Sequence, residues 1–397
     1  MRFNMRRGSV LAAALILSAA VLPTAADRPA EQPSPLTVHE WGTFTSVAGT
    51  DGSAIEWDAL GCKDDLPGFV NDFGYRGLKW RVGGTVRMET PVIYFYSPVA
   101  VVADVQIAFP QGLVTEWYPQ ARSDVYQTRG AGGAQRRLEK NLNGIDTSLK
   151  SVTGAIEWRH IDVQPDTAPA LPIERGPSHY YAARETDSAP ITVGGQHEKF
   201  LFYRGVGRFQ VPLSARLSPD GTVVVENRGD DAVPSVILFE NRGGRLGYRN
   251  AGVVEDAVTL GRPPLDDAFP QLRHDLESAL VEQGLFLKEA QAMVETWRDS
   301  WFEEGARLIY IMPSRAVDAI LPLRVAPAAS NIARVFVGRI ELVTPETTHT
   351  VEDALAADDW PTIDRYRRFL RPILQRVEPG YLARAPEAEV RLRQTCQ

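Results

Sequence analysis

Cysteine is nearly absent from this sequence, since its 397 residues include only Cys62 and Cys396. Two cysteines so far apart exclude a zinc site built from several thiolates. In an oxidising compartment the two could form one disulfide that ties the penultimate residue to the N-terminal region. Two free thiols are the alternative, and the sequence leaves both open.

The short motifs of common enzymes are also missing. The chain contains no G-x-S-x-G elbow, no phosphate-binding loop and no dinucleotide glycine fingerprint. His39-Glu40 and His197-Glu198 each begin like a zinc-protease motif, but Thr43 and Leu201 stand where the second histidine belongs. The zinc-protease interpretation is therefore excluded, and the sequence assigns no metal and no cofactor.

The only long apolar run lies at the N-terminus. Arg2, Arg6 and Arg7 precede the apolar stretch Val10–Leu22, and small residues end at Ala26. This pattern predicts a signal peptide over 1–26, followed by a proline-rich linker over 27–35. We expect an exported protein, periplasmic or extracellular, with no membrane span after the signal is removed. The net charge of −7 offers no basic surface, so nucleic acid is not an expected partner.

The remaining sequence predicts a mainly β protein. Runs rich in β-branched and aromatic residues recur from residue 36 to residue 250, separated by Gly, Pro and Asp turns, which indicates an antiparallel sandwich-like region. From 251 to 397 helices mix with strands, and we expect this α+β region to pack on the first. The helix expected over 288–302 carries Met293, Trp297 and Trp301 at four-residue spacing, a pattern typical of docking on a core.

The stretch Val38–Gly49 holds the densest group of polar and aromatic side chains. If it forms a strand, His39 and Glu40 point to opposite faces and cannot form a dyad. Neither face is cleanly apolar, which favours a strand covered on both sides. Each of the two polar groups then needs a partner on a neighbouring element.

The strand expected over 85–96 places Arg87 and Glu89 on one face and Met88, Val92 and Tyr94 on the other. The Arg-Glu pair can be a structural ion pair. It can also be one half of a site that receives a second carboxylate from a neighbouring strand.

Two further stretches carry candidate residues. Glu116 and Tyr118 share a face of one strand, and Trp158, His160 and Asp162 share a face of another. A His-x-Asp pair can bind a metal or perform acid–base chemistry, although a polar strand that faces solvent has the same pattern.

Four of the eight tryptophans directly follow a glutamate: Trp41, Trp57, Trp117 and Trp158. On adjacent strands one face could collect indoles and the other carboxylates, an arrangement that suits sugar recognition or glycoside cleavage. Tryptophan is equally common in the core of β-sandwiches. The catalytic candidates are therefore His39, Glu40, Glu89, Glu116 and His160, and the binding candidates are Trp41, Arg87, Trp117, Tyr118, Trp158 and Asp162.

Several segments together resemble an uncharacterised family of exported bacterial proteins. They are VHEWGTFTSVAG, VRMETPVIYFYSP, TEWYP, KFLFYRGVG, MVETWRDSWFEEGARLIYIMP and RVFVGRIELVTP. The resemblance covers residues 36–345 and implies export and an intact family member. It implies no activity, cofactor or catalytic residue.

Two classes of function remain. The first is a binding or envelope-structural module, which the missing catalytic motifs favour. The second is a hydrolase or lyase of an extracellular polymer, most plausibly a carbohydrate, that uses paired carboxylates and a histidine. A pocket open to solvent with two of the candidate carboxylates would favour the enzyme.

Overall fold

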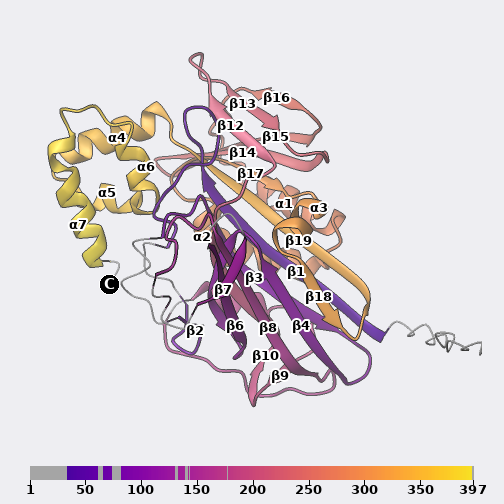
Figure 1. The fold of residues 1–397 in the computed structure, drawn as a ribbon. Helices are drawn as coiled ribbons and strands as arrows, with labels where there is room; N and C mark the ends of the chain where they lie inside the picture. Colours follow the sequence, from indigo (N-terminus) through magenta and orange to yellow (C-terminus); the bar gives the residue numbers. More distant parts are fainter. Residues whose placement is uncertain are drawn as a thin grey trace, which may run out of the picture. The chain divides into compact units, whose positions relative to one another are not determined.

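Strand β1, Ser34–Val47, is the centre of the structure. The computed structural model describes residues 34–60, 66–73, 82–129, 133–138, 142, 144–176 and 178–395. Residues Val38–Val47 are all buried, as expected for a strand covered on both faces. Strands β19 and β3 flank β1 in a nine-stranded sheet (Figure 1).

The described residues form strands in three sheets. The nine-stranded sheet has the order β15-β14-β17-β19-β1-β3-β11-β5-β2. Its other strands are β2 (Asn71–Asp72), β3 (Val86–Tyr96), β5 (Gly112–Tyr118), β11 (Phe200–Gly207), β14 (Val233–Arg242), β15 (Arg245–Val254), β17 (Gly305–Ile311) and β19 (Ala329–Leu342). A three-stranded sheet consists of β12 (Leu213–Leu217), β13 (Val223–Asn227) and β16 (Ala257–Leu260).

The third sheet contains β10-β9-β8-β4-β18, with β6 beside β8 and β7 beside β6. Its strands are β4 (Val101–Phe109), β6 (Arg122–Arg129), β7 (Ala134–Arg137), β8 (Val152–Val163), β9 (Ile191–Val193), β10 (Gln196–Glu198) and β18 (Leu323–Ala326). It packs against one face of the nine-stranded sheet, where Phe44 and Ile93 share a buried apolar cluster with Ile107 and Trp158. The prediction of a mainly β, sandwich-like protein is confirmed.

Helices cover the opposite face of the nine-stranded sheet. Helices α1 (Phe269–Glu282) and α2 (Leu287–Trp301) bury apolar side chains against Trp41, Val92 and Tyr94. Met293, Trp297 and Trp301 are all buried on α2, which confirms the predicted docking helix. A 3₁₀ helix, η1 (His179–Arg184), packs beside α2.

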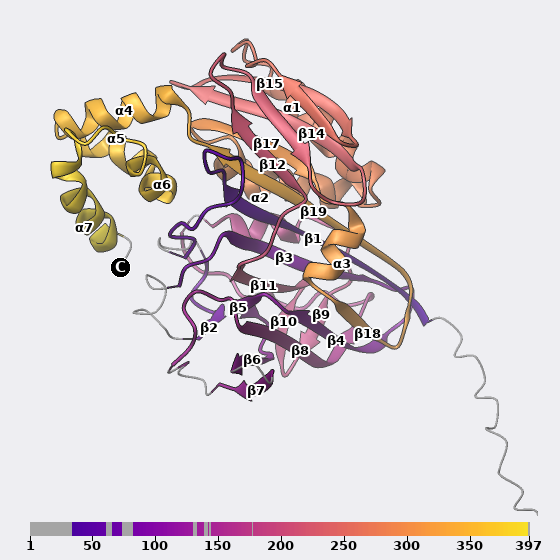
Figure 2. The ribbon, with the colours of Figure 1, turned by 45° about the horizontal axis from the view of Figure 1, so that its top comes forward.

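The C-terminal helices form a further layer with its own apolar cluster, which includes Trp57, Leu355 and Phe369. Figure 2 shows helices α4 to α7 gathered beside the strands, in yellow. The elements of this layer are α4 (Pro345–Ala356), α5 (Trp360–Arg365), η2 (Arg367–Phe369), α6 (Leu370–Leu374), η3 (Leu382–Arg384) and α7 (Ala385–Thr395). Helix α3 (Ser314–Ile320) packs against β19 instead.

The central pairing differs from the predicted antiparallel pattern, because β1 and β19 run parallel. Residues 33–397 form one compact unit. The expected division near residue 250 falls inside β15, and β17 and β19 from the later region complete the same sheet as β1 and β3. The later region therefore supplies central strands of the sheet as well as helices that pack on it.

Some predictions concern parts of the chain outside the described residues. These are the signal peptide over 1–26, the linker up to residue 33, and the cysteines Cys62 and Cys396. Among the helices that the structure describes, none combines the length and the apolar composition needed to cross a bilayer.

Candidate functional site

The alternation of β1 places His39 and Glu40 on opposite faces of the sheet, as predicted. His39 is buried, and its Nδ1 lies 2.7 Å from Oε2 of Glu289. Tyr96 donates a 2.9 Å hydrogen bond to the other oxygen of Glu289, and the backbone N–H of Phe286 donates one of 2.7 Å to Oε2. This network fixes the start of α2 on the sheet, so His39 has a structural partner.

Glu40 points into the core between the two large sheets. Its carboxylate accepts hydrogen bonds from the Tyr203 hydroxyl at 2.5 Å and from Nε of Arg334 at 2.6 Å. The side chain is fully buried. Glu40 lies on the face opposite that of Glu89, so Glu40 is not the second carboxylate that a site at the Arg87–Glu89 pair would need.

Strand β3 carries the predicted Arg87–Glu89 pair, with Nε of Arg87 3.3 Å from Oε1 of Glu89. The prediction that Val92 and Tyr94 share a face with Met88 is wrong. Thr90 has a φ of 45°, and the register with β1 shifts between Glu89 and Val92. This irregularity puts Val92 and Tyr94 on the helix-covered face, whereas Met88 faces the seven-stranded sheet that contains β4 and β8.

The three candidate residues on β5, Glu116, Trp117 and Tyr118, contact different parts of the structure. Trp117 faces the seven-stranded sheet and packs edge-on against Phe73. Tyr118 lies on the helix-covered face against Phe69. Glu116 is buried and accepts a hydrogen bond from Thr115, and it is Cα-paired with Arg204 of β11.

A bulge in β8 changes the predicted His-x-Asp strand. His160 has a φ of 59°, and its backbone N–H donates to Asp104 at 2.7 Å. Trp158 is fully buried and donates to the carbonyl of Pro119, while His160 is exposed and Asp162 is partly exposed. The expectation that Trp158 shares a face with His160 and Asp162 is therefore wrong.

The four tryptophans that follow glutamates do not gather on one face. Trp41 belongs to the cluster under α2, Trp57 to the cluster under the C-terminal helices, and Trp117 and Trp158 to the core between the sheets. All four are buried. The predicted indole platform is not formed.

One cavity does contain two of the candidates, Arg87 and Glu89. We call it the polar pocket; its volume is about 450 Å³. It lies between β3, β11, η1, the last turns of α2 and the segment around η2. The described residues that line it are Leu66, Arg87, Glu89, Thr90, His179, Tyr180, Arg204, Thr296, Trp297, Asp299, Ser300, Glu303, Asp364, Arg365, Arg367 and Arg368.

Glu89 and Glu303 meet at Arg368. The guanidinium of Arg368 donates to Oε1 of Glu89 and lies 3.6 Å from Oε1 of Glu303. It also donates a 2.7 Å hydrogen bond to the Ser300 hydroxyl. Three elements distant in sequence, β3, α2 and η2, are thereby joined at the wall of the pocket.

A second layer of charges lies behind this wall. Arg339 of β19 donates to Ser300 at 2.8 Å and to Glu303 at 2.5 Å. Glu341, two residues along the same strand, accepts from Arg339 at 3.1 Å and from Arg307 at 2.9 Å. Because these groups are buried and mutually paired, they hold the pocket wall in one arrangement.

The arginines control the charge state of both carboxylates. Burial alone would raise the pKa of Glu89, but the surrounding arginines, Arg368 foremost, outweigh it and lower the pKa. Burial likewise opposes ionisation of Glu303, and Arg339 with its neighbours lowers that pKa below the ordinary value of 4.5. Both side chains are therefore anionic near neutral pH.

This pairing predicts a pH-dependent contribution to stability. A carboxyl whose pKa is lower in the folded chain stabilises the fold above its unfolded pKa and loses that effect as the pH falls through the folded value. We expect Glu303→Gln to reduce the free energy of unfolding most at pH 7, with the difference from wild type shrinking below about pH 4.5. Urea unfolding across this range measures it, and a difference independent of pH would contradict the assignment.

One carboxylate oxygen and one indole N–H of residues that line the pocket make no hydrogen bond within the described residues. They are Oε2 of Glu89 and the indole Nε1 of Trp297, and both are buried. A buried acceptor and a buried donor without partners are each unfavourable, by about 1–3 kcal/mol. Because both side chains line the pocket, a molecule there that both donates and accepts hydrogen bonds is the nearest candidate partner for them.

Apart from Arg87 and Glu89, the residues of this site were not predicted, and the main ones among them are Trp297, Glu303, Arg339 and Arg368. One signal could have found Arg339, because β19 repeats the Arg-x-Glu spacing of β3, as Arg339–Glu341 beside Arg87–Glu89. Nothing local marks the others as site residues: Trp297 lies on α2, Glu303 just after its end, and Arg368 on η2. Among the described residues, no group of three or more histidine, cysteine or acidic side chains is placed to hold a metal ion.

Comparisons with known proteins give little further information. No described protein family matches the chain, and no curated protein is similar in sequence. Among solved structures, the chain is similar to the Fcho1 Mu homology domain of Danio rerio, solved with a bound Eps15 peptide. That similarity has a TM-score of 0.30 and 7% identity, and covers 79% of this chain and 97% of the other.

Proposed function

We propose that this protein is an exported binding module that holds a saccharide in the polar pocket. The observation that carries the proposal is the pair of unsatisfied buried atoms, Oε2 of Glu89 and Nε1 of Trp297, at one cavity. A hydroxyl group donates to a carboxylate and accepts from an indole N–H, so a ligand with several hydroxyls meets both needs. The volume of about 450 Å³ lies in the range of small-molecule sites.

The other lining groups suit the same ligand. Guanidinium and carboxylate groups both line the cavity, so donors and acceptors are present together. The buried pairs behind the wall hold these groups in place before a ligand arrives, and this preorganisation favours affinity. Export remains an expectation from the N-terminal sequence and places the protein where extracellular saccharides occur.

Binding is favoured over glycoside hydrolysis by the charge state of the carboxylates. Hydrolysis by a carboxyl pair needs one member protonated near neutral pH, with its pKa raised. The arginines lower the pKa of both Glu89 and Glu303. These two side chains therefore suit hydrogen bonding to a sugar and do not supply the general acid.

The test removes one of the two unsatisfied atoms. A glycan array first identifies a ligand of the wild-type protein, and calorimetry then compares Trp297→Phe with wild type. The substitution keeps most of the packing and deletes the N–H, so we expect a loss of roughly fivefold in affinity, the effect of one hydrogen bond.

Trp301→Phe is the matched control. Trp301 lies one turn further along α2 and its Nε1 is also buried without a partner among the described residues, but it is absent from the described lining of the pocket. We expect its affinity to equal that of wild type, with thermal unfolding showing that both variants fold. No ligand on the array, or an equal effect of the two substitutions, would overturn the proposal.

A further inference from the structure

A second cavity, of about 630 Å³, lies where several strands of the chain end. We call it the cationic pocket. Loops after β1, β11 and β13 supply polar side chains, as do the β4–β5 turn and the loop before β8. Those used below are Ser53, Gln111, Lys150, Arg208, Gln210 and Arg228. None of the described residues that line it is acidic.

Two guanidinium groups are held in place at this pocket. Arg208 donates to the carbonyls of Ser148 at 2.8 Å and Gly83 at 3.3 Å, and it pairs with Glu56. Arg228 donates to the hydroxyl of Ser53 at 3.3 Å and lies 3.5 Å from Glu226. Each arginine therefore has an acidic partner, but neither Glu56 nor Glu226 is among the described residues that line the cavity.

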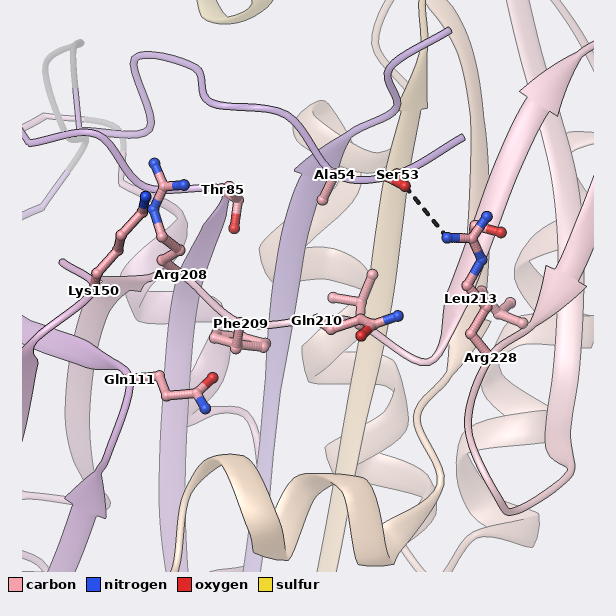
Figure 3. Close-up of a pocket in the computed structure, with 12 residues that line it drawn as sticks. Ser53, Ala54, Thr85, Gln111, Lys150, Arg208, Phe209, Gln210, Leu213 and Arg228 are labelled. Carbon is pink, nitrogen blue, oxygen red and sulfur yellow. Dashed lines mark hydrogen bonds between the residues drawn. The ribbon is translucent and has the colours of Figure 1, made fainter. Parts of the chain in front are cut away.

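Three other polar side chains at the pocket are not engaged by the protein. Over the ranges that the structure describes, the ammonium of Lys150 and the side-chain amides of Gln111 and Gln210 make no hydrogen bond or ion pair. Figure 3 shows Lys150 and Arg208 at one end of the pocket and Ser53 and Arg228 at the other, with Phe209 and Gln210 between them.

The cationic and amide side chains of this pocket indicate which class of ligand it can bind. The cationic ends suit a carboxylate, and an arginine can bind it through two parallel hydrogen bonds. The side-chain amides of Gln111 and Gln210 each offer a donor and an acceptor, which suits hydroxyl groups. We propose that the cationic pocket binds an acidic saccharide, a uronate unit, with its carboxylate at one cationic end and its hydroxyls against Gln111 and Gln210.

The experiment uses short oligogalacturonates and their methyl esters, in which each carboxylate is replaced by a neutral ester that is one methyl group larger. Calorimetry on the full chain at low salt is expected to show binding of the acid and at least tenfold weaker binding of the ester. Lys150→Gln is expected to weaken binding of the acid by roughly tenfold, the effect of one hydrogen bond between charged groups. Arg228→Gln is expected to act in the same direction.

Lys288→Gln is the matched control, because Lys288 is half-exposed, pairs with Asp187 and is absent from the described lining of this cavity. Equal binding of acid and ester, or equal affinities of Lys150→Gln and Lys288→Gln, would overturn the proposal. Displacement of the acid by inorganic sulfate at similar concentration would overturn its saccharide part, since sulfate has no hydroxyls. Trp297→Phe separates the two sites, because it should leave binding of the acid unchanged here.

Discussion

Replacing Arg307 with methionine is expected to destabilise the folded chain by about 3–5 kcal/mol, because it breaks a buried charge pair. Arg307 is fully buried and donates to both oxygens of Glu341, at 2.9 and 3.2 Å. It also donates to the carbonyls of Trp301, Glu303 and Glu304, where α2 ends. Methionine fills a similar volume but removes the donor of these carbonyls and leaves Arg339 as the only remaining arginine that donates to the buried carboxylate among the described residues.

Urea unfolding of the variant measures this loss. Arg315→Met is the control, because Arg315 is 85% exposed and its pair with Asp231 at 3.3 Å lies at the surface. Surface pairs contribute less than about 1 kcal/mol, so this control should stay close to wild type. If Arg307→Met also cost less than about 1 kcal/mol, the charged layer behind the polar pocket would not stabilise the fold as argued.

Gly338→Ala is expected to destabilise the chain by about 3 kcal/mol, at the upper end of overpacking effects. Gly338 of β19 is opposite Tyr310 of β17, whose buried ring lies across the glycine. A β-carbon at position 338 would lie 2.0 Å from Cζ of that ring. The ring cannot stay in place, and the close-packed core around it leaves little room for it to move.

A double-mutant cycle identifies the clash as the cause. Tyr310→Ala should cost much less in the Gly338→Ala background than in wild type, because the added methyl group then occupies space that the ring has left. Gly261→Ala is the control, since its β-carbon would meet only Arg249, at 3.9 Å, and should change stability by less than about 0.5 kcal/mol. Additive effects of the two substitutions would show that the ring is not the obstacle.

Local patterns in the sequence predict the elements of this fold well. The buried strand around His39 follows from its β-branched and aromatic residues, and the opposite faces of His39 and Glu40 follow from alternation alone. The tryptophans of α2 follow from helical spacing. Each of these predictions depends on neighbours within a few residues, and the physics that sets them is equally local.

Predictions based on strict alternation fail at two irregular residues. Thr90 and His160 adopt positive φ, and each shifts the residues that follow to the other face. A non-glycine residue in that conformation carries little mark in the sequence, although Pro91 after Thr90 is a hint. The polar pocket was missed for a different reason, because Glu89, Glu303 and Arg368 come from elements that only the tertiary fold brings together.

The parallel pairing of β1 with β19 has a consequence for how the chain folds. Glu40 and Arg334 are partners in that pair and lie 294 positions apart. At ribosomal rates of about 5–20 residues per second, roughly 15–60 s separate the synthesis of these two strands. Until then one edge of β1 exposes unpaired backbone groups, so the centre of the sheet forms late. The long separation of the two strands in sequence also raises the contact order of the fold. A nascent chain of this kind depends on protection from aggregation for most of its synthesis.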